Sequence, residues 1–219
     1  TGLARSDANV ETLSRMGASV LRGSLEDLDS LKRGAAEADG VIHLAFIHDF
    51  AKFAENGQID KRAIEAMGET LSGTNKPLVV TSGVGLLAPG RLSTEEDVAR
   101  LGEAIPRVSE HAAFAFANRG VRVSAVRLPQ VHGEPGKAGF VGYLAQAAGQ
   151  HRVSAYVGDG SNRWAAAHRA DVAPVYRLAL EKGAAGARYH AVGDEGVRLR
   201  DIAEIIGRQL NVPVVSIPP

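Results

Sequence analysis

The stretch that most constrains the fold is residues 121–133, VRVSAVRLPQVHG, in which an apolar run ends at a proline. Val121, Val123 and Val126 make the run short and rich in β-branched side chains, which predicts a buried strand. Pro129 has no N–H to give to a neighbouring strand, so the strand should end there and residues 130–133 should be loop. Ligands of open α/β sheets bind at such carboxyl ends. A core strand followed by an ordinary turn would show the same pattern.

The rest of the first half alternates strands and helices. Apolar runs predict strands over residues 2–4, 19–22, 41–46 and 78–82. Helices are predicted over residues 10–16, 24–38, 50–71, from 93 to the break at Pro106, and over 107–118. Strands that are apolar throughout and separated by helices indicate an α/β protein with a doubly wound parallel sheet.

The alternation loosens after residue 133. Helices are predicted over residues 140–148, 171–180 and 200–210, and extended segments over 156–157 and 189–192. In the last helix, Ile202, Ile205, Ile206 and Leu210 are placed on one apolar face. We therefore expect a sheet domain over residues 1–133 and a small mixed lobe over 134–219, with some of its segments returning to the main sheet.

Composition excludes several classes of protein. Among 219 residues, 25 basic side chains balance 25 acidic ones, which argues against nucleic acid as a partner. No cysteine is present, so there is no disulfide, thiolate zinc site or cysteine nucleophile. No apolar run reaches the ~20 residues of a membrane span. We expect a soluble, cytoplasmic monomer or homodimer with a small-molecule substrate and no metal, nucleic acid or membrane partner.

Four segments, in order along the chain, resemble the extended and atypical short-chain dehydrogenase/reductases, which include NAD-dependent epimerases and dehydratases. VIHLAF (41–46) is similar to the fourth strand of that family, and LVVTSGVG (78–85) to the fifth strand with its active-site Ser or Thr. VRLPQVHG (126–133) is similar to the Arg-x-x-x-Val-Tyr-Gly stretch beside the nicotinamide, and WAAAHRAD (164–171) to a late His-x-x-Asp element. The resemblance implies a Rossmann-like, NAD(P)-binding domain over 1–133 and a substrate lobe over 134–219.

The family's Tyr-x-x-x-Lys pair is missing. No tyrosine of the chain is followed four residues later by lysine. Counted back from Arg127, Glu110 matches a glutamate of the family, and the Tyr and Lys positions fall near Gly102 and Pro106. A tyrosine whose pKa is lowered by a neighbouring lysine therefore cannot be the acid. The atypical branch of the family also lacks the pair.

The family's glycine-rich phosphate loop is also missing. The resemblance places it before Thr1, and the glycine spacing of Gly136, Gly139 and Gly142 does not follow a strand directly, which favours a loop beside the substrate. We expect residues 1–219 to be a fragment that lacks about thirty upstream residues, one βα unit. Its sheet should then have a gap of about 10 Å between residues 2–4 and 41–46. Alone, it should neither fold cooperatively nor bind NADP tightly.

Several residues are expected to hold the cofactor. Arg5 and Ser6 follow the first strand, where an arginine accommodates the 2′-phosphate of NADP(H), so NADP(H) is expected rather than NAD(H). A solvated arginine at a loop start is the alternative. Ser24 and Leu25 match the family's adenine contact, although Ser24 would also suit a helix cap. The resemblance adds Leu44, Ala45, Phe46, Thr81, Leu128, Pro129 and Val131.

Two residues are expected to act in catalysis. Ser82 ends a buried strand, where an unpaired hydroxyl costs ~1–3 kcal/mol, so it would hold a substrate carbonyl or cap the next loop. His132 would donate a proton, since the reference pKa of histidine is about 6.5, or would merely pack under its loop. His43 is expected in the core, and Arg107 and His111 on a solvated helix face. Trp164, His168 and Asp171 are expected to support the second lobe.

These observations predict an oxidoreductase that uses NADPH to reduce a small carbonyl compound. The loss of the Tyr-Lys pair also allows an NADP(H)-binding redox sensor without turnover. An epimerase or dehydratase acting on a sugar nucleotide is the third possibility.

Overall fold

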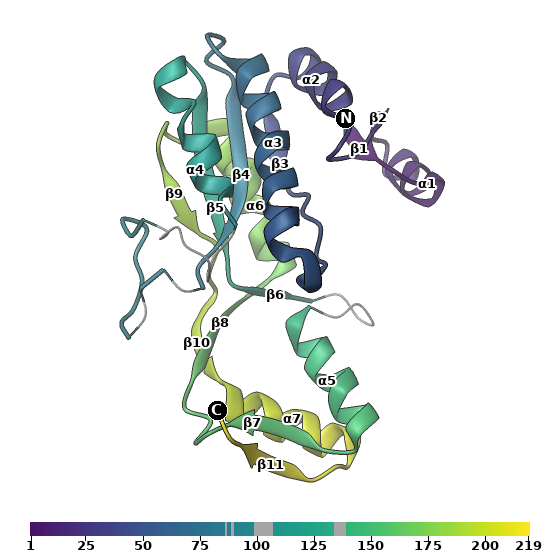
Figure 1. Ribbon diagram of the computed structural model, residues 1–219, viewed down its shortest axis with the longest axis vertical. Coiled ribbons are helices and arrows are strands. Elements are labelled where there is room, and N and C mark those ends of the chain that lie inside the picture. The colour runs from purple at the N-terminus through teal and green to yellow at the C-terminus, as the bar shows by residue number, and fades with distance from the viewer. Residues whose placement is uncertain (86, 89, 99–106, 134–138) are drawn as a thin grey trace. The chain divides into compact units, whose positions relative to one another are not determined.

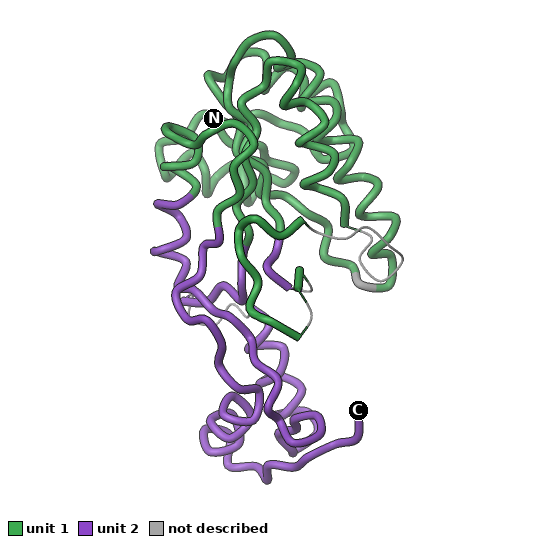
Figure 2. Tube along the Cα trace, turned by 90° about the vertical axis from the view of Figure 1, so that its left-hand side faces the viewer, with its two compact units in different colours: residues 1–82, 86–127, 176–189 green, residues 83–85, 128–175, 190–219 purple. Residues whose placement is uncertain are grey.

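The computed structural model describes residues 1–85, 87–88, 90–98, 107–133 and 139–219 (Figure 1). The chain forms two compact units, coloured separately in Figure 2. The first contains residues 1–82, 86–127 and 176–189, and the second contains residues 83–85, 128–175 and 190–219. The chain passes from one unit to the other several times, and residues 176–189, which come from the expected second lobe, lie in the first unit.

The first unit is built on parallel strands. A four-stranded sheet has the order β3 (Val41–His43), β4 (Pro77–Gly83), β5 (Arg122–Leu128) and β9 (Arg188–His190), and β3 runs parallel to β4. The strands β1 (Gly2–Ala4) and β2 (Val20–Arg22) pair in parallel with each other, as a separate two-stranded sheet. The predicted α/β class with a parallel sheet is confirmed. The split between the sheets falls where the resemblance would place one further strand.

Helices cover both faces of the four-stranded sheet. Figure 1 shows α3 (Phe53–Leu71) and α4 (Ser109–Phe114) on one face, and α6 (Arg169–Lys182) on the other. On α3, Ile64, Met67 and Leu71 recur at helical spacing and are buried in the main core. Full burial of such a side chain stabilises the fold by about 1.5–3 kcal/mol. The remaining elements of this unit are α1 (Asp7–Arg15), α2 (Leu28–Glu37), and the 3₁₀ turns η1 (Phe50–Lys52) and η2 (Ala117–Arg119).

Several predicted boundaries in the first unit are wrong. The helix expected over 10–16 begins at Asp7, and the one expected over 107–118 spans only Ser109–Phe114. The helix expected from residue 24 begins at Leu28, because Asp27 is its N-cap and accepts a hydrogen bond from the Ser30 N–H at 3.1 Å. The strand expected over 41–46 ends at His43. The helix expected from residue 93 is absent over 93–98, where the Asp97 carboxylate closes a turn by accepting the Thr94 N–H at 2.7 Å.

The second unit contains two small sheets. One has the order β10 (Asp194–Arg198), β8 (Arg163–His168) and β6 (Gln130–His132); β6 is parallel and β10 antiparallel to β8. The other pairs β7 (Ser154–Val157) in parallel with β11 (Val214–Ile217). The prediction that residues 130–133 are loop is therefore wrong for 130–132. Pro129 interrupts the strand, but pairing resumes at once because Gln130 meets Ala166, a partner 36 positions away that no local pattern reveals.

The helices of the second unit enclose its core. α5 (Phe140–His151) and α7 (Leu199–Leu210) pack with β7, and the Ser154 hydroxyl donates to the Ala203 carbonyl oxygen at 2.8 Å. The predicted helix over 200–210 is confirmed, but its apolar face is rotated from the expected one. Ile206 is buried, whereas Ile205 is 51% exposed.

Candidate functional site

A buried polar network joins the end of β3 to helices α3 and α4. Asp60, on α3, is fully buried, and its carboxylate contacts His43 Nε2 at 2.7 Å and accepts the Ser109 hydroxyl at 2.5 Å. His43 is thus a core histidine with a partner, as the sequence predicts. A buried carboxylate needs such partners, because a lone charge in an apolar interior is strongly unfavourable.

The Thr81 side chain is part of the same network. Its hydroxyl donates to the His43 carbonyl oxygen at 2.8 Å and lies 2.7 Å from the Tyr176 hydroxyl. Burial raises the pKa of Tyr176, although Thr81 and the Arg107 charge act against that rise. The hydroxyl of Thr81, a residue expected to contact the cofactor, therefore has protein partners on both sides.

Arg107 is not on a solvated face, so that prediction is wrong. Its guanidinium donates to the Thr81 carbonyl oxygen and to the Ser109 hydroxyl, each at 3.0 Å, and lies 4.3 Å from the centre of the Phe46 ring. Burial lowers the pKa of Arg107, and the charge of Asp60 opposes that shift. Arg107 is half-buried, and these partners together with the nearby charge of Asp60 hold it there.

Ser82 lies beside a buried ion cluster. Glu110 is 4% exposed and receives two bonds from Arg127, at 2.6 and 2.8 Å, and one from Arg188 at 3.2 Å. Burial alone would raise the pKa of Glu110, but the bonds from Arg127, Ser82 and Arg188 outweigh it and lower that pKa. Ser82 is half-buried near the end of β4, beside this cluster.

The residues expected at the adenosine end of a cofactor lie at the ends of β1 and β2. Arg5 and Ser6 are exposed, and Ser6 is the N-cap of α1, where it accepts the Asn9 N–H at 3.3 Å. Ser24 accepts two backbone N–H groups at 3.3 Å, so its capping alternative is realised ahead of α2. Leu25 is half-buried and packs against the main core.

The residues after β3 present an open edge. Leu44 is 60% exposed and Ala45 is also exposed, directly after the buried His43. Phe46 is half-buried, with the rings of His48 and Phe53 at 5.2 and 5.4 Å. A large apolar side chain held in water at the carboxyl edge of a parallel strand is what a ligand surface requires.

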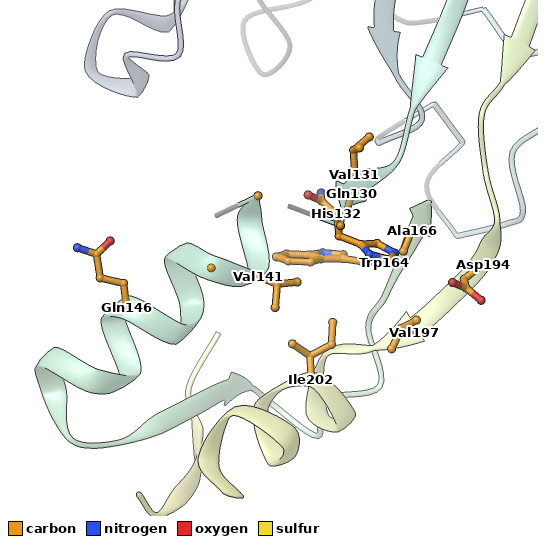
Figure 3. Close-up of a pocket in the computed structure, with 13 residues that line it drawn as sticks. Gln130, Val131, His132, Val141, Gln146, Trp164, Ala166, Asp194, Val197 and Ile202 are labelled. Atoms are coloured by element: carbon orange, nitrogen blue, oxygen red, sulfur yellow. The ribbon is translucent and has the colours of Figure 1, made fainter. Parts of the chain in front are cut away.

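The second unit contains a pocket of about 720 Å³ (Figure 3). Strands β6, β8 and β10 and helices α5 and α7 form its walls. Its lining includes two predicted site residues, Val131 and His132. Figure 3 shows the indole of Trp164 reaching from β8 toward Val141 on α5, with Ile202 of α7 beyond. Its volume is typical of small-molecule sites.

Most residues of this pocket have no signal in the local sequence pattern. Trp164, expected as structural support, is one of its walls, and its ring lies 4.9 Å from that of Phe140. One feature of the sequence could have indicated its role: Trp164 is the single tryptophan of the chain and lies in a segment that resembles a family element near the substrate. The predicted Leu128 and Pro129 are half-buried beside the pocket but not in its lining, and the Leu128 carbonyl oxygen accepts the Val84 N–H at 3.0 Å.

Glycine is required where α5 begins at the pocket. A Cβ on Gly139 would lie 2.6 Å from the Val131 carbonyl oxygen, so only glycine lets the start of α5 approach β6 this closely. Gly142 also lines the pocket. Gly136, the first member of this glycine series, lies outside the described residues, as do Gly102 and Pro106.

Two histidines meet at the edge of the pocket. The rings of His132 and His168 lie 5.5 Å apart, edge to face, and His168 Nδ1 accepts the Ala170 N–H at 3.2 Å. A neutral His168 therefore carries its proton on Nε2. His132 is exposed on β6, which rules out the alternative that it packs under a loop.

The described residues fit a nicotinamide nucleotide in part. Exposed Arg5 and Ser6 follow one parallel strand, and exposed Leu44 and Ala45 follow another. These are the positions at which dinucleotides bind such sheets. In the part of the chain that the structure describes, no group of three His, Asp or Glu side chains could hold a metal ion. No described helix is long and apolar enough to cross a membrane.

Comparison with known sequences identifies close relatives. The protein YLL056C of Saccharomyces cerevisiae is 47% identical over 221 residues, which cover 99% of this chain and 74% of that protein. The protein C2A9.02 of Schizosaccharomyces pombe is 47% identical over 220 residues, with the same coverage. The chain belongs to their family. Both members carry the description "uncharacterized protein". No protein-family model matches the chain.

Solved structures share the fold of this family. UDP-glucose 4-epimerase of Thermus thermophilus in complex with NAD has a TM-score of 0.73 and 18% identity, over 96% of this chain and 82% of that one. The dTDP-glucose 4,6-dehydratase DesIV of Streptomyces venezuelae with NAD has a TM-score of 0.76 and 19% identity, over 97% and 71% of the two chains. These likenesses confirm the predicted Rossmann-like fold.

Proposed function

We propose that the protein is an NAD(P)-binding oxidoreductase of the extended and atypical short-chain dehydrogenase/reductase type, which uses NADPH to reduce a small carbonyl compound. One observation carries this proposal: the chain shares its fold, over 96–97% of its length, with an epimerase and a dehydratase that were solved with NAD. The exposed residues at the ends of β1 and β3, and the pocket of the second unit, support it further.

The proposed cofactor site uses the ends of the parallel strands. Arg5 offers paired donors for a 2′-phosphate, which favours NADP(H) over NAD(H). Ser6, Leu44, Ala45 and Phe46 would line the rest. When bound, a reduced nicotinamide nucleotide would supply the hydride for the carbonyl carbon and be left oxidised, and the chain would supply the proton for the carbonyl oxygen.

The chain must hold the carbonyl and supply the proton. His132 is the proposed donor, since it lines a pocket that can hold a substrate and is exposed enough to be reprotonated from water. Ser82 is the proposed carbonyl contact. The alternative role of Ser82 is to cap the loop after β4.

A second candidate is an NADP(H) sensor without turnover. The observation that favours it is the missing Tyr-Lys pair. The sensor and the enzyme require the same cofactor site and differ only in chemistry. A carbonyl screen at fixed NADPH separates them.

Cofactor binding is tested first, by titrating the full-length protein with NADPH and NADH and following its thermal unfolding. Arg5→Ala should weaken NADPH binding much more than NADH binding, since one charge-assisted bond contributes ~1.5–3 kcal/mol, or about ten- to over a hundredfold. Arg15→Ala, in the exposed pair with Glu11 on α1, is the matched control and should change neither. Equal loss of both nucleotides in Arg5→Ala would remove the 2′-phosphate assignment.

Turnover is tested next, on substrates that the carbonyl screen identifies. His132→Ala should lower kcat by about 10²–10⁴-fold with little change in NADPH affinity, as expected for loss of a proton donor. Ser82→Ala should do the same if Ser82 contacts the carbonyl. Tight NADPH binding without turnover on any carbonyl would favour the sensor.

A further inference from the structure

The pocket of the second unit is lined mainly by apolar and uncharged polar side chains. This composition limits which substrates the proposed reductase can bind there. Its larger side chains are apolar or aromatic: Val131, Val141, Trp164, Val197 and Ile202. Its polar groups are Gln130, His132, Gln146 and Asp194. The described lining contains no lysine or arginine, and its one carboxylate is that of Asp194.

Two arginines are sequence neighbours of lining residues, but their side chains have partners outside the pocket. Arg163 precedes Trp164 on β8, so the alternation of a strand places it on the opposite face, where it donates to the Gly196 carbonyl oxygen at 2.9 Å. Arg198 follows the lining residue Val197 and pairs with Asp201 at 2.9 Å. Both cations of the adjoining strands thus have partners away from the pocket.

This distribution of charge disfavours an anionic ligand. A sugar nucleotide carries a diphosphate, and an anion taken from water without a compensating cation is strongly destabilised. The carboxylate of Asp194 would add repulsion. In contrast, the face of the Trp164 indole offers a flat apolar surface that suits a planar ring.

We infer that this pocket binds an uncharged, largely apolar carbonyl compound whose planar conjugated part lies against Trp164, and that it does not bind a sugar nucleotide. Gln130 and Gln146 are the amide groups that can orient a neutral polar end. The substrate role rests on the proposed function, whereas the ligand preference rests on the pocket alone.

The test is a fluorescence titration of the full-length protein without cofactor. Trp164 is the only tryptophan in the 219 residues, so the difference between wild type and Trp164→Phe isolates its signal. Three probes are compared: 2-naphthaldehyde, its anionic counterpart 2-naphthoate, and UDP-glucose. We expect saturable quenching of Trp164 by 2-naphthaldehyde, binding of 2-naphthoate weaker by about tenfold or more, and no saturable response to UDP-glucose.

Two variants sharpen the result. Asp194→Asn removes the pocket carboxylate with little change in size, and should strengthen 2-naphthoate binding several-fold while leaving 2-naphthaldehyde unchanged. Ile202→Arg should weaken 2-naphthaldehyde by about tenfold or more, because it fills and charges the apolar wall. Circular dichroism establishes that each variant is folded before its titration is used.

Three outcomes would overturn the inference: no binding of 2-naphthaldehyde, UDP-glucose binding as tightly as 2-naphthaldehyde with a Trp164 response, or an Asp194→Asn variant that does not improve 2-naphthoate. Failure of the proposed function gives a different result. The protein would then bind 2-naphthaldehyde at Trp164 but show no NADPH binding in the separate nucleotide titration.

Discussion

At the scale of single residues, Arg127 depends most strongly on its partners, because its charge is fully buried. Its side chain is fully buried, and it meets Glu110 through two parallel bonds at 2.6 and 2.8 Å. Such a pair adds little stability compared with an apolar pair of equal size, but either partner left alone is strongly destabilising. Replacing either Arg127 or Glu110 alone should therefore destabilise the fold at the end of β5.

We predict that Arg127→Met lowers the free energy of unfolding by about 3–5 kcal/mol, because it leaves the buried Glu110 with Arg188, at 3.2 Å, as its remaining ion-pair partner. Urea denaturation measures this loss. Arg177→Met is the matched control, since Arg177 forms an exposed pair with Glu181 on α6, and its effect should stay within about 0.5 kcal/mol. Similar losses in both variants would mean that Arg127 is not a buried partner.

The same cluster predicts a pH dependence of stability. The folded pKa of Glu110 lies below its ordinary value of 4.5, so the unfolded chain binds the proton more readily. The stability that Glu110 contributes is therefore complete above about pH 5 and is lost as the pH falls through the ordinary value toward the folded pKa. The difference in the free energy of unfolding between wild type and Glu110→Gln should accordingly shrink as the pH falls below 4.5 toward the folded pKa. A constant difference from pH 7 to pH 3 would contradict the lowered pKa.

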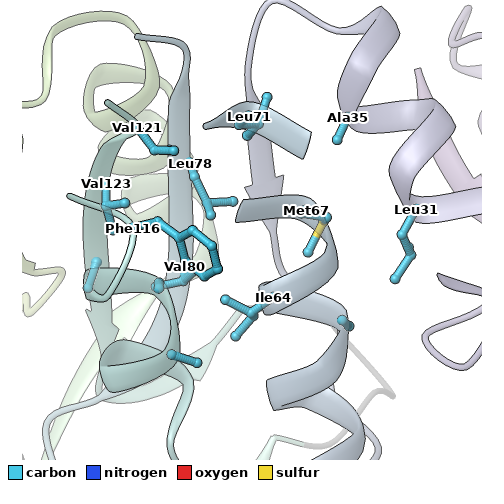
Figure 4. Packing of buried hydrophobic residues seen from close by; sticks show 14 residues of the cluster. Leu31, Ala35, Ile64, Met67, Leu71, Leu78, Val80, Phe116, Val121 and Val123 are labelled. Atoms are coloured by element: carbon cyan, nitrogen blue, oxygen red, sulfur yellow. The ribbon is translucent and has the colours of Figure 1, made fainter. Parts of the chain in front are cut away.

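At the scale of elements, the contact between α3 and the turn before β5 decides how the sheet is covered. Figure 4 shows Phe116 beside Ile64, Leu78 and Val80 in the main core. Gly68 is the point of closest approach on α3, because a Cβ there would lie 2.5 Å from the Phe116 ring. Glycine is a poor helix former, so its presence in the middle of α3 reflects packing rather than propensity.

We predict opposite effects for two glycine-to-alanine changes in helices. Gly68→Ala should destabilise the protein by about 1–3 kcal/mol, because overpacking against Phe116 outweighs the gain in helix propensity. Gly149→Ala, in α5, should stabilise by up to about 1 kcal/mol, because a Cβ at Gly149 has no neighbour within 4 Å. Thermal unfolding of both variants gives the comparison. A stabilising Gly68→Ala would show that Phe116 moves aside.

At the scale of the whole molecule, the chain builds two separate cores. The core of the first unit gathers apolar side chains from α2, α3, α4, β4 and β5. That of the second unit is smaller and depends on α5, α7 and β7, with Ala148, Ala203 and Ile206 buried. Because each unit has its own buried contacts, damage to one core should be felt mainly within that unit.

We predict that Ile206→Ala weakens the second unit selectively. Loss of a buried isoleucine costs about 2–5 kcal/mol, and hydrogen exchange should accelerate in α5, α7 and β7 while β4 and β5 stay protected. Ile205→Ala, at the exposed neighbouring position on α7, serves as the control and should leave exchange unchanged. Equal loss of protection in β4 and β7 would show that the two units unfold as one.

The fold class could be predicted from the sequence because its signals are local. Apolar strands such as residues 78–82 and the 3.6-residue spacing on α3 are set by which residues are neighbours along the chain. The core position of His43 also followed from the alternation of its strand. These features need no knowledge of distant partners.

Only the tertiary structure decided those features whose partners lie far away in sequence. Strand β6 exists because β8 pairs with it, and Arg107 is half-buried because distant residues, Thr81 and Phe46, contact its guanidinium. Trp164 became a pocket wall when β8 was placed opposite α5 and α7. A strand pairing or a buried charge is stabilised by a partner rather than by its own neighbours, so no pattern within a dozen residues records it.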